Sequence, residues 1–432
     1  MSKKIIYNAH ILTMNPQLEV IPTGSILIEE GKITAISAGK INDDEAVYTD
    51  AHGMLVMPGL VNTHTHVPMT LFRGYADDLP LHTWLTEYIF PAEATFITPE
   101  NVRAASQLAF LEMIKSGTTC FNDMYFFEDL IAEEAKKAGI RAMLSNSLID
   151  FPTPCFKTVE EGMEMNERLL QKWQNDATIH PSVCVHSPYT CCKETLQRTK
   201  AQADKYNTTL HVHLAETRKE VEDMMQQTGM TPAQYFHSIG LLDKNVVAAH
   251  CVWLNEKDIE LMAETHTGIA HCPKSNLKLA SGIANIDRYV RAGIRVGIGT
   301  DGTASNNTLD MVEEMRFAAL LPKVIDYNPE AMSARQVIQS ATIQGAKALG
   351  LGNRIGSIEV GKEADLILID TNDVNMTPLY DEFSAIAYAM SSRNIQASMV
   401  HGEWIMKDRK VLHLDEEEVL EKVRNIALTI KK

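Results

Sequence analysis

Imidazole and carboxylate side chains recur at one kind of position in this chain, directly after a short β-prone segment. These positions are His64, His66, Asp123, His186, His213, Glu216, His250, His271 and Asp301. Imidazole nitrogens and carboxylate oxygens are common ligands of a catalytic divalent cation. The same groups serve as general acids and bases when they lie beside a substrate. The set therefore indicates metal-dependent acid–base chemistry, provided that the fold brings these residues together.

His64 and His66 are two residues apart, so in a β-strand their side chains share one face. A His-x-His pair alone equally fits two polar residues at a strand end. His213 and Asp301 complete a mixed nitrogen and oxygen set. We predict that these four side chains bind one divalent cation, with Zn²⁺ as the first candidate. Fe²⁺, Mn²⁺ and Ni²⁺ accept the same ligands, so the residues do not select the metal.

Glu216 and His250 are the candidates for acid–base and polar roles beside the metal. Glu216 follows His213 by three residues, so its carboxyl group can reach a substrate without binding the metal. A solvated loop glutamate is the alternative, but the neighbouring ligand favours a proton carrier. We expect His250 to hydrogen-bond the water that attacks the substrate. Its alternative role is that of a buried structural histidine.

The middle of the chain alternates between strand and helix signals. This alternation predicts an α/β fold, a (β/α)8 TIM-type barrel, in which the C-terminal strand ends meet at one mouth. The predicted strands are 55–63, 118–122, 142–145, 182–185, 209–212, 246–249, 268–270 and 294–298. The predicted helices include 99–115, 128–138, 159–174, 193–205 and 257–264. No Gly-x-Gly-x-x-Gly follows the first strand, which disfavours a dinucleotide-binding sheet.

Both ends of the chain are rich in strand and turn signals. They lie at Gly24–Ser37, Ala364–Asp370 and Ser398–Lys407. We predict that residues 1–57 and 359–432 form one discontinuous β-sandwich domain, with the barrel in residues 58–358. Residues 416–431 read as an amphipathic helix.

Composition narrows the class of protein. Of the 432 residues, 45% are hydrophobic and 22% are charged, as in a folded globular protein. Forty basic and 56 acidic residues give a net charge of −16, which disfavours nucleic-acid binding. The longest uncharged run, Ala51–Phe72, is interrupted by histidines and prolines and disfavours a membrane helix. With no signal-like start and no disulfide framework in seven cysteines, we expect a cytoplasmic enzyme. A homo-oligomer stays open.

Three motifs resemble the amidohydrolase superfamily over nearly the whole chain. They are Pro58-Gly-Leu-Val-Asn-Thr-His-Thr-His66, Gly299-Thr-Asp-Gly302 and Gly356-Ser-Ile-Glu-Val-Gly-Lys-Glu-Ala-Asp-Leu366. Binuclear members often carry a carboxylated lysine at the end of strand four. His186 stands at that position here, so the resemblance implies one metal ion.

The finer pattern resembles the 5-methylthioadenosine/S-adenosylhomocysteine deaminases. It includes Pro68–Gly74, Asp123–Phe126, His186–Thr190, His213–Thr217, Ala249–Val252, Ser275–Leu279 and Thr300–Asn307. The resemblance implies a small-molecule purine nucleoside as substrate and one divalent metal. Its implied ligands are His64, His66, His213 and Asp301. Its implied substrate contacts are Glu216 at the purine ring and Glu93, His186, Trp84 and Ser305 elsewhere, with packing as the alternative for Trp84.

Such an enzyme would replace the 6-amino group of 5′-methylthioadenosine, S-adenosylhomocysteine or adenosine and release ammonia. Glu216 would protonate N1, Asp301 would carry the proton of the attacking water to the amine, and His250 would orient that water. Residues 145–157 contain no arginine and only Lys157 as a cation, which favours the methylthio substrate.

Guanine deaminases and triazine hydrolases share parts of the same motif set. The alternative is therefore a deaminase or dechlorinase of another aminated heterocycle. Glu93 argues against it, because a free base has no ribose diol to bind. A catalytically inactive barrel that serves as a scaffold is a third reading, which the intact ligand set and Glu216 disfavour.

Overall fold

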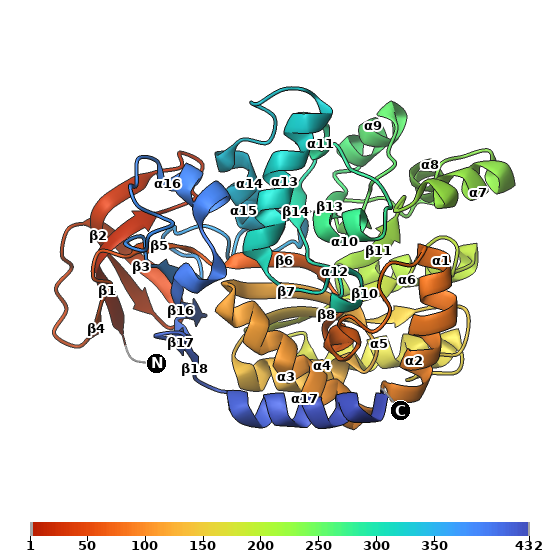
Figure 1. Ribbon diagram of the computed structural model, residues 1–432, viewed down its shortest axis with the longest axis horizontal. Coiled ribbons are helices and arrows are strands. Elements are labelled where there is room, and N and C mark those ends of the chain that lie inside the picture. The colour runs from red at the N-terminus through yellow and green to blue at the C-terminus, as the bar shows by residue number, and fades with distance from the viewer. Residues whose placement is uncertain (1–2, 431–432) are drawn as a thin grey trace.

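A closed parallel barrel and a mixed β-sheet make up the computed structural model, which describes residues 3–430 (Figure 1). The barrel closes because β10 pairs with β8 as well as with β11. Its strands are β6 (Leu60–Thr65), β7 (Thr118–Tyr125), β8 (Arg141–Leu148), β9 (Ile179–Pro181), β10 (Val183–Val185), β11 (Leu210–Leu214), β12 (Val246–His250), β13 (Gly268–His271) and β14 (Val296–Ile298). The predicted (β/α)8 fold is confirmed.

The strands β9 and β10 together occupy one position of the barrel. Both pair in parallel with β8, and Ser182 separates them. Pro181 lacks the N–H group that a continuous ladder requires, so the strand is interrupted there. With this interruption, the described chain has eight barrel positions, as the alternation of elements predicts.

The first predicted strand, residues 55–63, is wrong as a single element. It divides at Gly59 into β5 (Leu55–Pro58), which belongs to the terminal sheet, and β6, which opens the barrel. A Cβ atom at Gly59 would lie 2.0 Å from Oγ1 of Thr119, so no larger residue fits at this crossing. A continuous apolar run shows burial but does not show where the chain passes between sheets.

Helices cover the barrel between its strands (Figure 1). The helix α3 (Pro99–Lys115) begins as predicted, because Thr98 accepts a hydrogen bond from the backbone N–H of Asn101 and Pro99 is its first residue. Further helices on the barrel are α4 (Glu128–Ala138), α5 (Val159–Trp173), α6 (Lys193–Tyr206), α7 (Arg218–Thr228), α8 (Pro232–Ser238), α9 (Glu256–Glu264), α11 (Ile286–Arg291), α13 (Met311–Ile325), α14 (Ala334–Ala341) and α15 (Ile343–Ala348).

Shorter helices lie in the loops at the C-terminal ends of the strands. They are η1 (Val67–Phe72), α1 (Leu81–Thr83), η2 (Trp84–Ile89), α2 (Phe90–Phe96), α10 (Pro273–Lys278) and α12 (Thr303–Asn306). A further group, α16 (Glu382–Ser384), η3 (Ala385–Ala389) and η4 (Ser392–Asn394), precedes the last strands. The loop after β6 is therefore largely helical.

Both chain ends contribute to one continuous sheet, in the order β18-β17-β16-β15-β5-β1-β2-β3 with β4 beside β1. Its strands are β1 (Lys4–Leu12), β2 (Val20–Glu29), β3 (Lys32–Ala38), β4 (Val47–Asp50), β5, β15 (Leu366–Ile369), β16 (Ile395–Val400), β17 (Glu403–Lys407) and β18 (Lys410–Val411). Ile6, Ile26, Leu366 and Met399 share one buried cluster, so strands from both chain ends enclose a common core. The domain bounds 1–57, 359–432 and 58–358 stay a prediction.

Buried ion pairs join the base of the barrel to this sheet. Arg141, the first residue of β8, is fully buried. Its Nε and Nη2 donate to the two carboxylate oxygens of Asp365, at 2.7 and 2.9 Å, and Nη2 also donates to Glu363 at 2.5 Å. Glu363 accepts a further hydrogen bond from Nε of Arg354 at 2.6 Å. Opposite charges are therefore paired throughout this contact.

The last helix, α17 (Glu416–Ile430), leaves the sheet and lies along α3 (Figure 1). Val423 and Ile430 join the barrel core, and Lys115 forms an ion pair with Glu416. The predicted end of this helix, Lys431, lies outside the described residues. None of the helices in residues 3–430 combines the length and the apolar composition that crossing a membrane requires.

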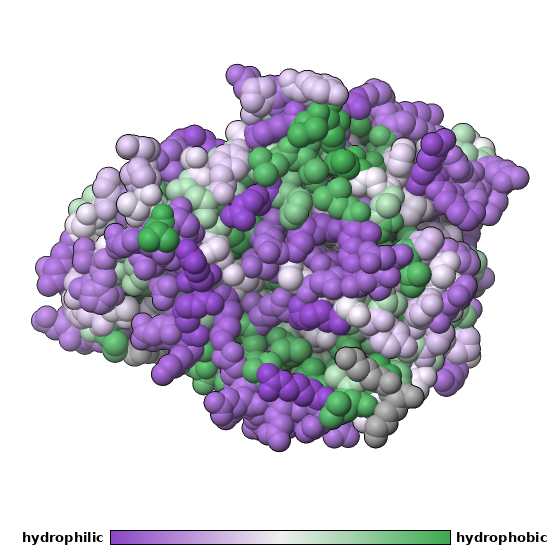
Figure 2. Space-filling view, in the orientation of Figure 1, coloured by the Kyte–Doolittle hydropathy of each residue, from purple (hydrophilic) through white to green (hydrophobic). Residues whose placement is uncertain are grey.

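The surface is mainly hydrophilic on the face shown in Figure 2, with an apolar area over α13. Phe317, Leu320 and Val324 of this helix are exposed. None of the three lines the cavity at the mouth of the barrel or the one beside it.

Candidate active site

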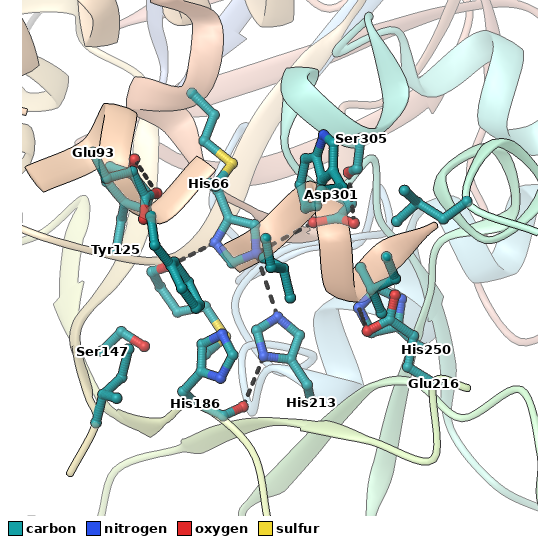
Figure 3. A pocket seen from close by; sticks show the side chains of 18 of the residues that line it. His66, Glu93, Tyr125, Ser147, His186, His213, Glu216, His250, Asp301 and Ser305 are labelled. Carbon is teal, nitrogen blue, oxygen red and sulfur yellow. Dashed lines mark hydrogen bonds and ion pairs between the residues drawn. The ribbon is translucent and has the colours of Figure 1, made fainter. Parts of the chain in front are cut away.

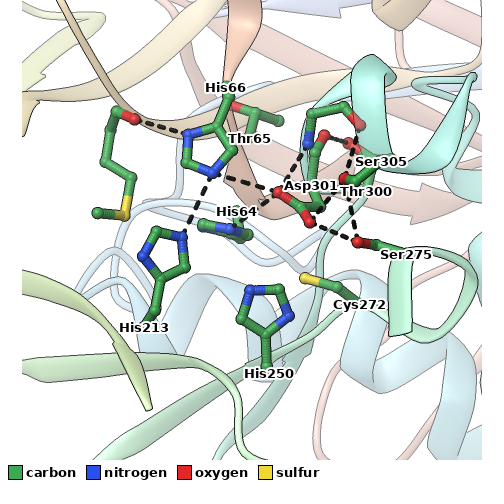
Figure 4. Close-up of polar contacts among 12 residues, drawn as sticks. His64, Thr65, His66, His213, His250, Cys272, Ser275, Thr300, Asp301 and Ser305 are labelled. Carbon is green, nitrogen blue, oxygen red and sulfur yellow. Dashed lines mark hydrogen bonds and ion pairs between the residues drawn. The ribbon is translucent and has the colours of Figure 1, made fainter. Parts of the chain in front are cut away.

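The four predicted metal ligands meet at the mouth of the barrel (Figure 4). Nε2 of His64 and Nε2 of His66 lie 3.3 and 3.2 Å from the same oxygen of Asp301, Oδ1. Nε2 of His213 lies 3.3 Å from Nε2 of His66. His64 lies in β6, His66 directly follows that strand, His213 lies in β11 and Asp301 lies in the loop after β14, so the barrel joins residues that are far apart in sequence.

The opposite ring nitrogens show which atoms are free to bind a cation. Nδ1 of His66 donates to the carbonyl oxygen of Met124, and Nδ1 of His213 donates to that of His186, both at 2.7 Å. Each Nε2 then faces the centre, an arrangement typical of metal-binding histidines. Nε2 of His64 is buried and has no hydrogen-bond partner within residues 3–430. The four side chains therefore fit one divalent cation.

Burial and charge set the protonation of this cluster. Burial lowers the pKa of His64 to about 4, which keeps the ring in the neutral form that binds metals. Burial also lowers the pKa of His66, but the Asp301 carboxylate outweighs this effect and raises it to about 9. Burial favours protonation of Asp301, yet the two histidines hold its pKa well below the usual range. The carboxylate therefore attracts positive charge to this point.

A fourth histidine, His211, supports the ligands and was missed from the sequence. Its Nε2 lies 3.1 Å from Nδ1 of His64, and its Nδ1 lies 2.9 Å from Nδ2 of Asn122. His211 and His213 are two residues apart on β11, so both point into the barrel. The His-x-His spacing used for His64 and His66 would have found it.

Glu216 and His250 face each other beside the ligands. Oε2 of Glu216 lies 3.9 Å from Nε2 of His250, and both side chains are buried. Nδ1 of His250 lies 2.9 Å from Oδ1 of Asn276, which fixes the ring. Burial raises the pKa of Glu216, so its carboxyl group holds a proton more readily than a solvated one. This is the property that a general acid requires.

Glu220 holds the loop that presents Glu216, and the sequence analysis did not identify it. Its two carboxylate oxygens accept hydrogen bonds from the backbone N–H groups of Ala215 and Glu216, both at 2.8 Å. Ala215 has a left-handed φ of 50°. Thr217 caps α7 through the N–H of Glu220, so the helix start and the loop are fixed together. Burial raises the pKa of Glu220 to about 8.

Hydrogen bonds from neighbouring residues also fix both oxygens of the Asp301 carboxylate. Its Oδ2 accepts from the hydroxyl groups of Ser275 and Ser305 at 2.5 and 2.9 Å, and its Oδ1 accepts from the N–H of Gly302 at 2.8 Å. Ser305 was predicted to contact the substrate. It lines the cavity, and its hydroxyl group also orients Asp301.

The remaining predicted residues line a cavity above this cluster. It measures about 640 Å³, including its opening to solvent. Figure 3 shows Glu93 on one side of His66 and Asp301, Glu216 and His250 on the other. The hydroxyl group of Tyr125 donates to Oε1 of Glu93 at 2.6 Å, and burial raises the pKa of Glu93 to about 7. The predicted site residues on the wall are His66, Trp84, Glu93, His186, His213, Glu216, His250, Asp301 and Ser305.

Two strand-end histidines do not line the cavity. His64 is fully buried beneath it, as a ligand that faces only the metal would be. His271, at the end of β13, is also buried and lies outside the cavity wall. Tyr125, Ser147, Ile149 and Tyr189 do line the wall, although no spacing in the sequence marks them.

A sequence model for the amidohydrolase family matches residues 55–405. The chain belongs to the amidohydrolase family. This amidohydrolase is 42% identical over 429 residues to a 5-methylthioadenosine/S-adenosylhomocysteine deaminase of Thermodesulfovibrio yellowstonii, with 98% of each chain covered. It is 43% identical over 430 residues to a 5′-deoxyadenosine deaminase of Methanosarcina acetivorans, covering 99% of this chain and 98% of the relative.

The structure of the amidohydrolase is similar to that of an adenosine deaminase from Xanthomonas campestris with bound zinc. The TM-score is 0.96 at 36% identity, over 99% of this chain and 98% of the other. The predicted family and fold are confirmed. The enzyme is a hydrolase of a metal-dependent family, and its His and Asp cluster offers the ligands.

Proposed function

We propose that this amidohydrolase deaminates the 6-amino group of 5′-methylthioadenosine, S-adenosylhomocysteine and adenosine, and releases the inosine-type product and ammonia. One observation carries the proposal. Glu216, His250 and Asp301 converge at one end of a cavity, while a buried Glu93 stands at the other end. The first end has the groups that an aminated ring requires for deamination, and the second end has a carboxylate that can bind a ribose diol. Two relatives, named for deaminases of 5′-substituted adenosines, support it.

His64, His66, His213 and Asp301 are the residues that would hold one divalent cation, with Zn²⁺ as the first candidate. A bound cation of this kind lowers the pKa of water far enough to supply hydroxide near neutral pH. Nε2 of His64 and Nε2 of His66 lie 3.3 and 3.2 Å from Oδ1 of Asp301, and Nε2 of His213 lies 3.3 Å from Nε2 of His66. His186 stands where a binuclear member would carry a lysine, which supports a single metal ion.

The proton transfers fall to Glu216 and Asp301. Glu216, whose pKa is raised by burial, donates a proton to N1 of the purine and so prepares C6 for attack. Asp301 takes one proton of the attacking water and delivers it to the departing amine. The second proton of that water, on the oxygen at C6, replaces the proton that Glu216 gave to N1. His250 hydrogen-bonds the oxygen at C6 and stabilises its developing charge, since Asn276 fixes the ring toward Glu216.

Glu93 accepts hydrogen bonds from the 2′- and 3′-hydroxyl groups of the ribose. Tyr125 already occupies Oε1, which fixes the carboxylate and leaves Oε2 and further lone pairs for the substrate. Trp84 covers a face of the nucleoside, while His186 and Ser305 complete the contacts on the wall. A guanine- or triazine-type substrate has no diol, so Oε2 of the buried Glu93 would receive no hydrogen bond from it. This supports a nucleoside substrate.

An ammonia-release screen of the metal-loaded enzyme tests the proposal. Adenosine, 5′-methylthioadenosine, S-adenosylhomocysteine, guanine and a triazine are compared by kcat/KM. We expect the three adenosines to react, with 5′-methylthioadenosine ahead of S-adenosylhomocysteine because residues 145–157 lack arginine. Reaction with only guanine or the triazine would overturn the proposal.

The proposal also includes the features of the protein that accompany a metabolic enzyme of this kind. We propose a cytoplasmic location, no nucleic-acid or membrane partner, and a barrel of residues 58–358 between the two parts of the terminal domain.

A further inference from the structure

A second cavity adjoins the one that holds the candidate active site. The two share Phe90, Glu93, Phe126 and Ile149, so Glu93 stands at their boundary. The second cavity, here called the outer cavity, continues between α2 and the loop that follows β8. Asp301, Glu216 and His250 lie on the side of His66 away from Glu93 (Figure 3).

The wall of the outer cavity is mainly aromatic and apolar. Phe90 and Phe151 meet edge to face with ring centroids 5.8 Å apart. Pro152 and Pro154 follow Phe151 in the same loop, and Phe151 is 40% exposed. Exposed aromatic side chains at the mouth of a cavity mark a surface that can gain free energy by covering an apolar group.

Charge is sparse on this wall. Of the described residues that line it, Lys157 carries the only positive charge. Its Nζ lies 3.4 Å from the carbonyl oxygen of Thr153, and its backbone N–H donates to Glu161. A lysine at an exposed rim cannot form the paired hydrogen bonds with which a guanidinium group holds a carboxylate. The outer cavity is therefore poorly suited to an amino-acid group.

We propose that the outer cavity binds an apolar 5′ substituent of the substrate, larger than methylthio, and that Phe90 and Phe151 determine this specificity. The inference rests on the proposed function. With the purine at the metal-ligand cluster and the ribose diol on Glu93, the 5′ carbon lies on the side of the ribose away from the base. That is the side on which the outer cavity begins.

The test is a series of 5′ substituents with growing apolar surface. Deamination of adenosine and of its 5′-methylthio, 5′-butylthio and 5′-benzylthio derivatives is compared with that of S-adenosylhomocysteine. Each methylene group removed from water increases the binding affinity about fourfold, and butylthio has three more of them than methylthio. The value of kcat/KM should therefore rise at least about tenfold from the methylthio to the butylthio compound. The kcat/KM for S-adenosylhomocysteine should be about tenfold below that for the butylthio compound, because its charged groups would lose their hydration without gaining hydrogen-bond partners.

Phe151→Ala tests the wall directly. It should lower the ratio of kcat/KM for the benzylthio compound to that for adenosine by about tenfold, through loss of the aromatic contact. Phe317→Ala, on α13 and exposed to a similar degree (38%), is the matched control and should leave the ratio unchanged.

The outcomes separate the two proposals. If adenosine reacts but kcat/KM stays flat or falls along the series, the outer cavity does not bind the substituent and only this inference fails. A preference for S-adenosylhomocysteine over the butylthio compound would likewise overturn it. If neither adenosine nor any of its 5′ derivatives reacts, the proposed function fails and the inference fails with it.

Discussion

The two ends of the barrel contain buried polar clusters of opposite kinds. At the base, Arg141 lies between Asp365 and Glu363, so each buried charge faces an opposite one. At the mouth, Nε2 of His64 and Nε2 of His66 converge on a single oxygen of Asp301, with no buried cation such as Arg141 between them among the described residues. Both clusters connect segments that are distant in sequence.

The difference separates stabilisation from chemistry. A paired cluster such as that of Arg141 loses much when one partner is removed, because a buried charge is then left alone. A cluster of convergent acceptors gains its partner only when a cation binds, and it is the part that the reaction uses. The comparison predicts that substitutions at the base lower the stability of the fold without changing turnover. Substitutions at the mouth should lower turnover without changing the stability of the fold.

Removal of a ligand at the mouth should have the largest effect. His64→Ala or His213→Ala should lose the metal and lower kcat/KM by about 10⁴-fold or more, since the cation lowers the pKa of water from about 16 to about 7. Elemental analysis and ammonia release measure both losses. His271→Ala, which removes a buried strand-end histidine outside the cavity wall, should keep the metal. A full metal equivalent in both ligand variants would refute the assignment.

Glu216→Gln should separate acid chemistry from metal binding. We expect the metal to stay and kcat to fall by about 10²–10⁴, the contribution of a positioned general acid. Steady-state kinetics with metal analysis measure both quantities. Glu222→Gln, at an exposed position on α7, should change neither. Normal turnover in Glu216→Gln would assign the protonation of N1 to another group.

Arg141→Met tests the base. The free energy of unfolding should fall by about 3–5 kcal/mol, because Asp365 and Glu363 become buried charges without their main partner. Urea unfolding measures this, while kcat of the folded enzyme at 25 °C should stay the same. Arg168→Met removes an exposed pair with Glu164 and should cost less than about 1 kcal/mol. A lower kcat in Arg141→Met would show that the two ends are coupled.

Glu220→Gln sharpens the comparison within the mouth. An amide has one acceptor oxygen, so one of the N–H groups of Ala215 and Glu216 would face an NH₂ group. We expect kcat to fall by about 10- to 100-fold through misplacement of Glu216, with KM and metal content little changed. A loss of stability without this fall in kcat would limit Glu220 to a structural role.

The smallest predicted effect concerns the far end of the cavity. If Glu93 binds the diol, 2′-deoxyadenosine should have a kcat/KM at least about tenfold below that of adenosine, since a buried carboxylate loses a donor. Glu93→Ala should slow both substrates and narrow the gap. The gap should also narrow as the pH falls below about 7, because the carboxylate then becomes protonated. Equal rates on the two nucleosides in the native enzyme would remove Glu93 from the ribose site.

The barrel and its ligand cluster could be predicted because the C-terminal ends of the barrel strands converge independently of the conformation of the loops. The prediction of His64, His213 and Asp301 as ligands required only the alternation of strands and helices and the position of these residues at strand ends. The role of His211 could have been predicted by applying the two-residue spacing of His64 and His66 to His211 and His213 as well. Ser305 was assigned to the substrate, but its hydroxyl group also contacts Asp301, a contact that depends on the turn after β14.

Other features depend on the path of the backbone and leave no local pattern. Glu220 contacts the loop only because Ala215 adopts a left-handed conformation. The division of the first predicted strand at Gly59 follows from the close approach of Thr119, a residue far along the chain. Arg141 and Asp365 are more than two hundred positions apart, so neither signals the other.

The left-handed residues at the mouth have a consequence for how the enzyme can change. Ala215, His250 and Asp301 have φ angles of 50°, 70° and 60°, a region that costs a non-glycine residue about 1–3 kcal/mol. The surrounding fold must supply the free energy that holds them there. Variants that relax these residues would tolerate heat better and turn over more slowly. Improved catalysts of this scaffold therefore depend on stabilising substitutions placed far from the mouth.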